Sequence, residues 1–299
     1  MLQRVTAGVL VSLVLVLLFL FGNAWVLIGL TLILHLLAQD EFRRLASAAS
    51  LPIERLAVPL CGIAYLLAMV TETAYAQTLY GEVEDGRIFA HFGVTPSEVI
   101  LWLAPALFLV IGIFRRRPEK ALERVAVSMA SFWYTAVLLG FLARLTLDWT
   151  HLDTGRLVLL YTLFVVKMSD AGAYFIGMRF GRKGPRLIPE ISPAKSVIGL
   201  VGGYLFGLAS SLLFAYGAHA FGDGTLGGMP LPCRHAAILG ILLPTAGCLG
   251  DLAESLFKRS VRIKDSAARL PGLGGILDMM DSALFAAPFM YLYLRLFLL

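Results

Sequence analysis

Residues 236–256 read AAILGILLPTAGCLGDLAESL, an apolar stretch whose only charges, Asp251 and Glu254, lie near its carboxyl end. About 20 consecutive apolar residues cross the hydrocarbon core of a bilayer as an α-helix. Similar stretches recur along the whole chain, and no series of short alternating strands indicates a membrane barrel. The sequence therefore predicts an all-α fold, a polytopic bundle of membrane-spanning helices.

The composition agrees with this fold class. Of the 299 residues, 59% are hydrophobic and 15% are charged. The hydrophobic share is higher and the charged share lower than in soluble domains. We expect about nine transmembrane helices of this length. They are predicted at residues 5–21, 24–39, 56–72, 98–114, 125–143, 157–177, 197–216, 236–256 and 275–298.

The amino-terminal apolar run is longer than the apolar region of a signal peptide and has no convincing cleavage site, so we interpret it as a retained helix. A tight hairpin at Gly22-Asn23-Ala24 fits the charges better than one long kinked helix. The three cysteines, Cys61, Cys233 and Cys248, have no metal or redox spacing and are expected to serve in packing.

Basic residues are concentrated in alternate connections between the predicted helices. The rich connections contain Arg43, Arg44, Arg55, Arg115, Arg116, Arg117, Lys120, Arg124, Arg179, Arg182, Lys183, Arg186, Lys195, Lys258, Arg259, Arg262, Lys264 and Arg269. The poor connections contain only Arg87, Arg144, Arg156 and Arg234. By the positive-inside rule, the amino terminus is expected in the cytoplasm and the carboxyl terminus on the opposite side.

A first group of charges lies at the end of the stretch quoted above. Asp251, Glu254, Ser255 and Lys258 share one helical stripe. Lys258 can reach the water boundary from there, but Asp251 lies roughly 10 Å deeper along the helix. A carboxylate at that depth needs a partner.

A second group is PGLGGILDMMD, residues 271–281. Asp278 and Asp281 share a helix face, and Asp278 is expected at the depth of Asp251. Two carboxylates meeting there repel each other unless a cation lies between them, and oxygen ligands suit Mg²⁺. The alternative for Asp278 is a carboxylate favoured by the positive end of a helix dipole.

A third group lies in residues 167–196. Asp170 is expected inside the membrane with Lys167 one turn away, and the two can neutralise each other. The segment Ser192-Pro193-Ala194-Lys195-Ser196 has the character of a helix start that holds phosphate. Together the three groups predict a pocket for a soluble polyphosphate and an anionic lipid, with metal supplying the electrophilic assistance.

The stretch from Ser255 to Asp281 resembles the signature of the phosphatidate cytidylyltransferases, or CDP-diacylglycerol synthases: S-x-x-K-R-x4-K-D, a Pro-Gly turn, H-G-G and D-R-x-D. The residues that match are Ser255, Lys258, Arg259, Lys264, Asp265, Pro271, Gly272, Gly274, Gly275, Asp278 and Asp281. The resemblance extends upstream through GDLAES, SPAKS and SDAGAYFIG, and so covers the carboxyl-terminal half. Leu273 and Met279 depart from the pattern, standing where the family has His and Arg.

The resemblance implies attack of the phosphate of phosphatidate on the α-phosphate of CTP, which forms CDP-diacylglycerol and releases pyrophosphate. It implies catalytic roles for Asp251, Asp278, Lys258 and Lys264, with Asp281 completing a magnesium site and a second cation left open. Substrate contacts are expected from Ser192, Lys195, Ser196, Ser255, Arg259, Asp265, Gly274, Gly275 and Asp170.

The resemblance further implies a multi-pass protein of a bacterial-type inner membrane with its site facing the cytoplasm. Residues 1–150 would be amino-terminal helices and residues 151–299 the catalytic part. No nucleic-acid partner is expected, and a homodimer is one compatible oligomeric state. Two other functions stay open because of Leu273 and Met279: CTP-dependent modification of another lipid such as a polyprenol, and a non-catalytic scaffold or regulator.

Overall fold

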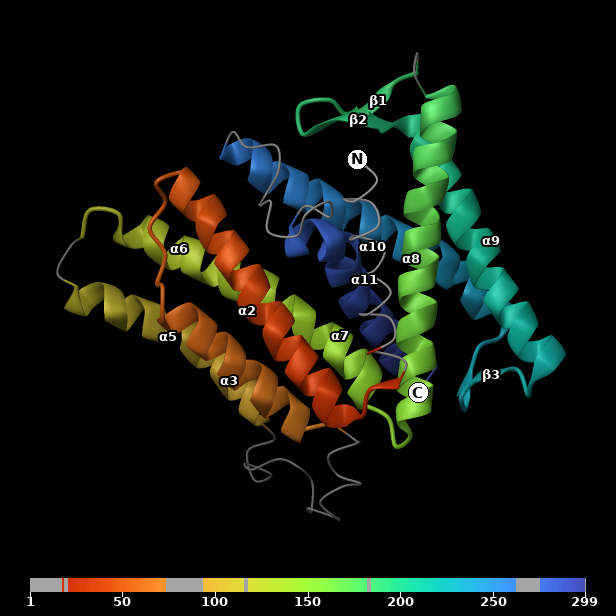
Figure 1. Cartoon of the computed structure of the whole chain (residues 1–299), viewed down its shortest axis with the longest axis horizontal. Coiled ribbons are helices and arrows are strands. Elements are labelled where there is room, and N and C mark those ends of the chain that lie inside the picture. The colour runs from red at the N-terminus through yellow and green to blue at the C-terminus, as the bar shows by residue number, and fades with distance from the viewer. Residues whose placement is uncertain are drawn as a thin grey trace. The chain divides into compact units, whose positions relative to one another are not determined.

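The computed structural model describes residues 18, 21–73, 94–115, 118–181, 184–261 and 275–298. Helices make up most of this part of the chain (Figure 1). They are α2 (Ala24–Ala48), α3 (Ala57–Thr71), α5 (Pro96–Phe114), α6 (Ala121–Phe132), the π-helical turn η1 (Trp133–Val137), α7 (Leu138–Leu147), α8 (Leu152–Phe180), α9 (Val197–Phe221), α10 (Cys233–Ser260) and α11 (Ile276–Phe297). The described strands are β1 (Arg186–Ile188), β2 (Ser192–Ser196), β3 (Thr225–Leu226) and β4 (Met229–Pro230), which form two antiparallel hairpins.

The predicted membrane fold is confirmed. Within the described ranges, six helical stretches are long and apolar enough to cross a membrane: Ala24–Ala48, Pro96–Phe114, Ala121–Leu147, Leu152–Phe180, Val197–Phe221 and Cys233–Ser260. Each predicted segment from 24–39 onward overlaps a described helix. The first predicted segment, 5–21, lies almost wholly outside the described residues, so the number of nine stays a prediction.

Helix starts coincide with capping residues in the sequence. Asn23 accepts a hydrogen bond from the N–H of Val26 at the start of α2, which explains the predicted break before Ala24. Thr95 and Glu98 form a reciprocal capping box at the start of α5. These local signals set where the apolar helices begin.

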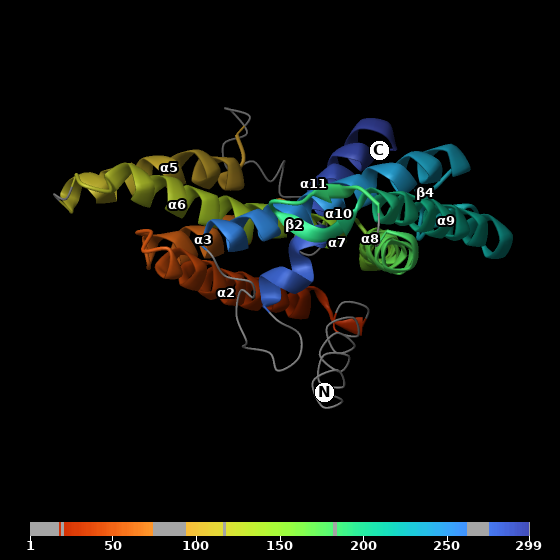
Figure 2. The same cartoon turned by 90° about the horizontal axis from the view of Figure 1, so that it is seen from above.

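The chain forms two compact units, Met1–Leu152 with Ser260–Met279, and Asp153–Arg259 with Met280–Leu299. In the first unit α3 contacts α2, α5, α6 and α7. Figure 2 shows α5 and α6 on one side of α3 and α2 on the other. The predicted division between residues 150 and 151 concerned catalytic roles and stays a prediction.

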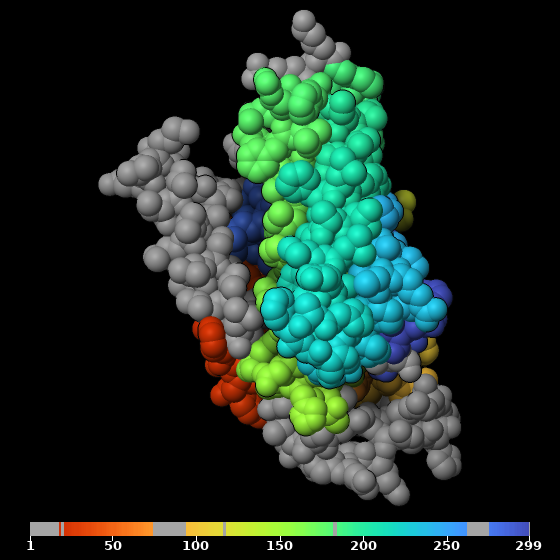
Figure 3. Space-filling view, turned by 90° about the vertical axis from the view of Figure 1, so that its right-hand side faces the viewer, coloured from red at the N-terminus to blue at the C-terminus, as the bar shows by residue number. Residues whose placement is uncertain are grey.

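In the second unit, α8 and α9 pack along their lengths (Figure 3). Glycines allow this approach: an added Cβ at Gly172 would collide with Phe206, and one at Gly207 would collide with Pro244 of α10. Small residues at such contacts are the usual basis of close helix packing in membranes. The close packing fixes the ends of α8, α9 and α10 that carry the charged residues.

Candidate active site

Three aspartates of the second unit come from three different helices. Asp170 lies on α8, Asp251 on α10 and Asp281 on α11. They are near enough for the charge of Asp251 to act on both other carboxylates. The side chains of Asp170 and Asp251 are partly exposed, whereas Asp281 is buried, with 6% of its surface exposed. Sequence reasoning proposed all three for the site, but it gave Asp170 no role in a metal centre.

Ser282 connects two of these aspartates. Its hydroxyl oxygen lies 3.2 Å from Oδ2 of Asp170 and 3.1 Å from Oδ1 of Asp281. The Ser282 N–H also donates to Asp281 Oδ1 at 2.6 Å. A serine has one hydroxyl proton, so it donates to one carboxylate at a time. The carboxylates of Asp170 and Asp281 therefore keep negative charge that the single Ser282 hydroxyl does not neutralise.

Two lysines contact the same group. Lys195 Nζ lies 2.8 Å from Asp251 Oδ2 and donates to the carbonyl of Cys248 at 3.4 Å. Lys167 Nζ lies 3.4 Å from Asp170 Oδ2, which is the predicted pairing one turn apart. Among the described side chains, three carboxylates thus face two ammonium groups, which leaves an excess of negative charge.

Lys195 reaches Asp251 from a short hairpin that the sequence did not predict. Strand β2 pairs with β1, with Ser192 opposite Ile188 and Ser196 opposite Arg186. The helix start expected in this segment is present at Ser196, the residue after Lys195. Ser196 accepts a hydrogen bond from the N–H of Gly199 at 3.1 Å and caps α9. Ser192 and Lys195 therefore lie on a strand that leads directly into the helix.

The carboxyl end of α10 carries the predicted basic residues. Lys258 Nζ lies 2.7 Å from Oε2 of Glu254, a carboxylate with 2% of its side chain exposed. Arg259 donates to the carbonyl of Ile191, in the turn between β1 and β2, at 3.3 Å. Ser255, one turn before Lys258 on α10, is half-buried. The end of α10 and the β1–β2 hairpin therefore form one polar surface beside Asp251.

Asp278 lies in the first turn of α11, in the first unit. Its Oδ2 accepts a hydrogen bond from the N–H of Gly275 at 3.1 Å, which fits the alternative of a carboxylate at a helix amino end. Asp281 follows three residues later on the same face of α11. The predicted approach of Asp278 to Asp251 stays a prediction.

Some predicted site residues lie outside the described part of the chain: Lys264, Asp265 and Gly274, together with the departure at Leu273. The other departure, Met279, is half-buried on α11. Across the described ranges, no group of three or more histidine, cysteine, aspartate or glutamate side chains is arranged to hold a metal ion.

Sequence reasoning missed two residues, one in each unit. Ser282 follows Asp281 directly, but a hydroxyl beside a carboxylate is too common to indicate a shared contact. Glu41 of α2 is 4% exposed and accepts a hydrogen bond from the N–H of Leu277 at 3.2 Å. It lies in a charged run, DEFRR at residues 40–44, and nothing in that run distinguishes Glu41 from a solvent-exposed acidic residue.

Comparison with known proteins gives consistent results. The sequence model of the Cytidylyltransferase family matches residues 2–297. The chain is 29% identical to the phosphatidate cytidylyltransferase of Bacillus subtilis, over 99% of this chain and 98% of the relative. It is 32% identical to that of Haemophilus influenzae, over 96% of each chain. For the Chlamydia muridarum protein of the same name the identity is 32%, over 65% of this chain and 63% of the relative.

Proposed function

The chain belongs to the cytidylyltransferase family, and on this premise we propose that it transfers the cytidylyl group of CTP to phosphatidate. The products are CDP-diacylglycerol and pyrophosphate. Full-length similarity to two phosphatidate cytidylyltransferases supports this substrate pair. The observation that carries the proposal is the cluster of Asp170, Asp251 and Asp281 with Lys195 ion-paired to Asp251.

The reaction needs little proton transfer from the protein. A phosphate monoester near neutral pH already carries nucleophilic oxyanions. One of them forms a bond to the α-phosphorus of CTP while the bond to the bridging oxygen breaks, and pyrophosphate leaves with those electrons. The protein must therefore position two polyanions and neutralise their charge.

Basic and hydroxyl side chains would hold the phosphates. Lys195, Lys258 and Arg259 occur on adjoining surfaces of the β1–β2 hairpin and the end of α10. Lys264 is proposed for the same role from the sequence pattern. Serine hydroxyls and glycine amides would complete the substrate contacts, from Ser192, Ser196, Ser255, Gly274 and Gly275. Asp265 is proposed as a further substrate contact.

The oxygen ligands of these carboxylates suit a magnesium ion by their chemistry, although the described side chains are not arranged around a common metal position. Three carboxylates with two lysines and one shared serine hydroxyl have an excess of negative charge, and oxygen ligands suit Mg²⁺. Asp251 and Asp281 would hold the ion, with Asp278 one turn earlier on α11 and Asp170 beside them. Bound there, Mg²⁺ would withdraw charge from the reacting phosphates.

The protein is a multi-pass membrane protein. We further propose that it lies in the inner membrane with its site facing the cytoplasm. The alternation of basic-rich and basic-poor connections supports this orientation. CTP would then reach the site from the cytoplasm, while phosphatidate would arrive from the inner leaflet.

The test is pyrophosphate release by the full-length protein in lipid micelles with CTP, Mg²⁺ and phosphatidate. Asp251→Asn should lower the rate by about 100-fold or more because it removes a charge at the reacting centre. Asp153→Asn is the matched control: its side chain is 82% exposed at the opposite end of α8 from Asp170. An unchanged rate in Asp251→Asn would contradict the proposed site.

A lipid panel at fixed CTP tests the substrate. Turnover of a polyprenol or its phosphate, without turnover of phosphatidate, would favour the second lipid-modifying function. Absence of both pyrophosphate release and CDP release with every lipid, followed by a large gain in Leu273→His with Met279→Arg, would favour a non-catalytic protein.

A further inference from the structure

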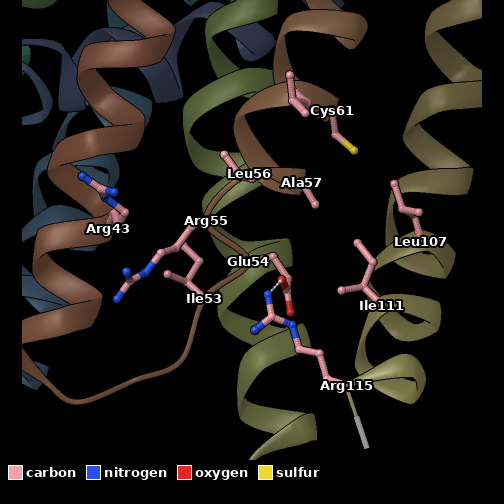
Figure 4. A pocket seen from close by; sticks show the side chains of 11 residues that line it. Arg43, Ile53, Glu54, Arg55, Leu56, Ala57, Cys61, Leu107, Ile111 and Arg115 are labelled. Atoms are coloured by element: carbon pink, nitrogen blue, oxygen red, sulfur yellow. Dashed lines mark hydrogen bonds and ion pairs between the residues drawn. The ribbon is translucent and has the colours of Figure 1, made fainter.

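A cavity of about 770 Å³ opens in the first unit, where α2, α3 and α5 approach one another (Figure 4). It contains none of the residues proposed for cytidylyl transfer. Three arginines are among the residues that line it: Arg43 from α2, Arg55 from the connection before α3, and Arg115 just after α5. Figure 4 shows Arg43 and Arg55 on the α2 side and Arg115 beside Glu54, so basic side chains from three separate helix ends belong to the lining.

The wall beyond the arginines is apolar. Leu56 and Leu60 at the start of α3 are 76% and 62% exposed, and Leu107 of α5 is 43% exposed. A helix rises by about 1.5 Å per residue, which puts Leu60 roughly 7 Å from Arg55 along the axis of α3. By the same rise, Leu107 lies roughly 12 Å from Arg115 along the axis of α5. The space therefore changes from cationic to apolar over the length of a lipid headgroup and the start of its chains.

The arginines are incompletely neutralised. Arg115 lies 2.7 Å from Glu54, and this buried carboxylate also has Arg124 at 3.8 Å. Arg43 shares Asp40 with Arg44, at 2.6 and 3.1 Å.

Arg55 is exposed and forms no ion pair with any described residue. Among the described residues that line the cavity, Glu54 is the only acidic one beside three arginines, so this part of the lining carries a net positive charge. The chemistry that complements it is an anion with an apolar tail.

We infer that this cavity binds one anionic phospholipid, with its phosphate against Arg55 and the neighbouring arginines and an acyl chain along Leu56, Leu60 and Leu107. Guanidinium groups pair with phosphate through two parallel hydrogen bonds, which favours arginine at such sites. The exposed leucines lie on helices of a membrane protein, where acyl chains are the solvent. A soluble phosphate would leave this apolar wall unused.

The experiment is a titration of the full-length detergent-purified protein with phosphatidylglycerol, followed by native mass spectrometry. Arg55→Gln and Arg43→Gln should each weaken binding about five-fold, the factor expected for one basic residue acting on an anionic lipid. Arg44→Gln is the matched control, because Arg44 also pairs with Asp40 but does not line the cavity. Arg44→Gln should bind as the unaltered protein does.

Three further ligands separate the sources of binding. Phosphatidate and phosphatidylglycerol should both bind, phosphatidylcholine should bind at least five-fold more weakly, and glycerol phosphate should not compete. Equal weakening in Arg44→Gln would indicate a diffuse charge effect and overturn the site. Equal affinity for phosphatidylcholine, or full competition by glycerol phosphate, would also overturn it. Leu60→Trp, which fills the apolar wall without touching a charge, should weaken lipid binding while the protein stays folded.

Discussion

The carboxylate of Glu41 on α2 accepts a hydrogen bond from the backbone N–H of Leu277, at 3.2 Å, in the first turn of α11. Glu41 is buried and its negative charge lies at the positive end of the α11 dipole. The same turn carries Asp278, whose carboxylate is held by the N–H of Gly275. Glu41 therefore fixes the backbone from which a proposed catalytic carboxylate projects.

Replacing Glu41 should affect both stability and activity. Glu41→Leu leaves a buried N–H without its acceptor, which should lower the free energy of unfolding by about 1–3 kcal/mol. Because Asp278 loses its fixed position, kcat should fall more than KM for CTP rises. Glu41→Gln keeps an acceptor oxygen and should lose less of both. Thermal unfolding in detergent and steady-state pyrophosphate release measure the two effects, and a Glu41→Leu protein with unchanged kcat would contradict the positioning role.

Lys195 is predicted to act through its charge next to Asp251. Lys195→Ala removes the ammonium group 2.8 Å from that carboxylate and should lower kcat/KM by about 100-fold. Lys195→Arg keeps the charge and should retain more activity than Lys195→Ala. Initial rates over a series of CTP concentrations distinguish the variants. Activity of Lys195→Ala within two-fold of the unaltered protein would remove Lys195 from the mechanism.

The helices could be predicted from sequence because a bilayer leaves the backbone few alternatives. Their ends could not be predicted as well. The predicted segment 157–177 corresponds to α8, Leu152–Phe180, and 236–256 corresponds to α10, Cys233–Ser260. Hydropathy detects only the part within hydrocarbon, whereas the helices continue into polar sequence. The β1–β2 hairpin was missed because its strands are short and have no alternating pattern.

The site was predictable where charge stands out against apolar sequence. Asp170 and Asp251 were found this way, since each interrupts a predicted span. Glu41 was missed because its partner is a backbone group 236 residues away, and no local pattern records such a contact. Ser282 was missed because its role depends on α8 and α11 meeting, which the sequence does not reveal.

Ser282 is predicted to tune the carboxylates it contacts. Ser282→Ala removes the hydroxyl near Asp170 and Asp281. The Mg²⁺ concentration that gives half-maximal pyrophosphate release should rise by about ten-fold, as for other residues that orient metal ligands. Ser210→Ala is the control: this hydroxyl is also buried, but its one hydrogen bond to a described residue goes to Gly207 of its own helix. A magnesium titration compares the two. Equal magnesium dependence in both variants would show that Ser282 does not act on the carboxylates.

Gly250 is predicted to be essential for the contact between α10 and α11 next to Asp251. An alanine Cβ at Gly250 would collide with the backbone carbonyl oxygen of Asp281 and lie 3.1 Å from Cβ of Phe285. Backbone cannot move aside as a side chain can, so Gly250→Ala should lower the free energy of unfolding by about 1–3 kcal/mol and reduce activity. Gly217→Ala is the control, because nothing lies within 4 Å of its added Cβ, and it should be neutral or stabilising by about 0.5–1 kcal/mol. Equal melting temperatures for the two variants would show that α10 and α11 have room to separate beside Asp251.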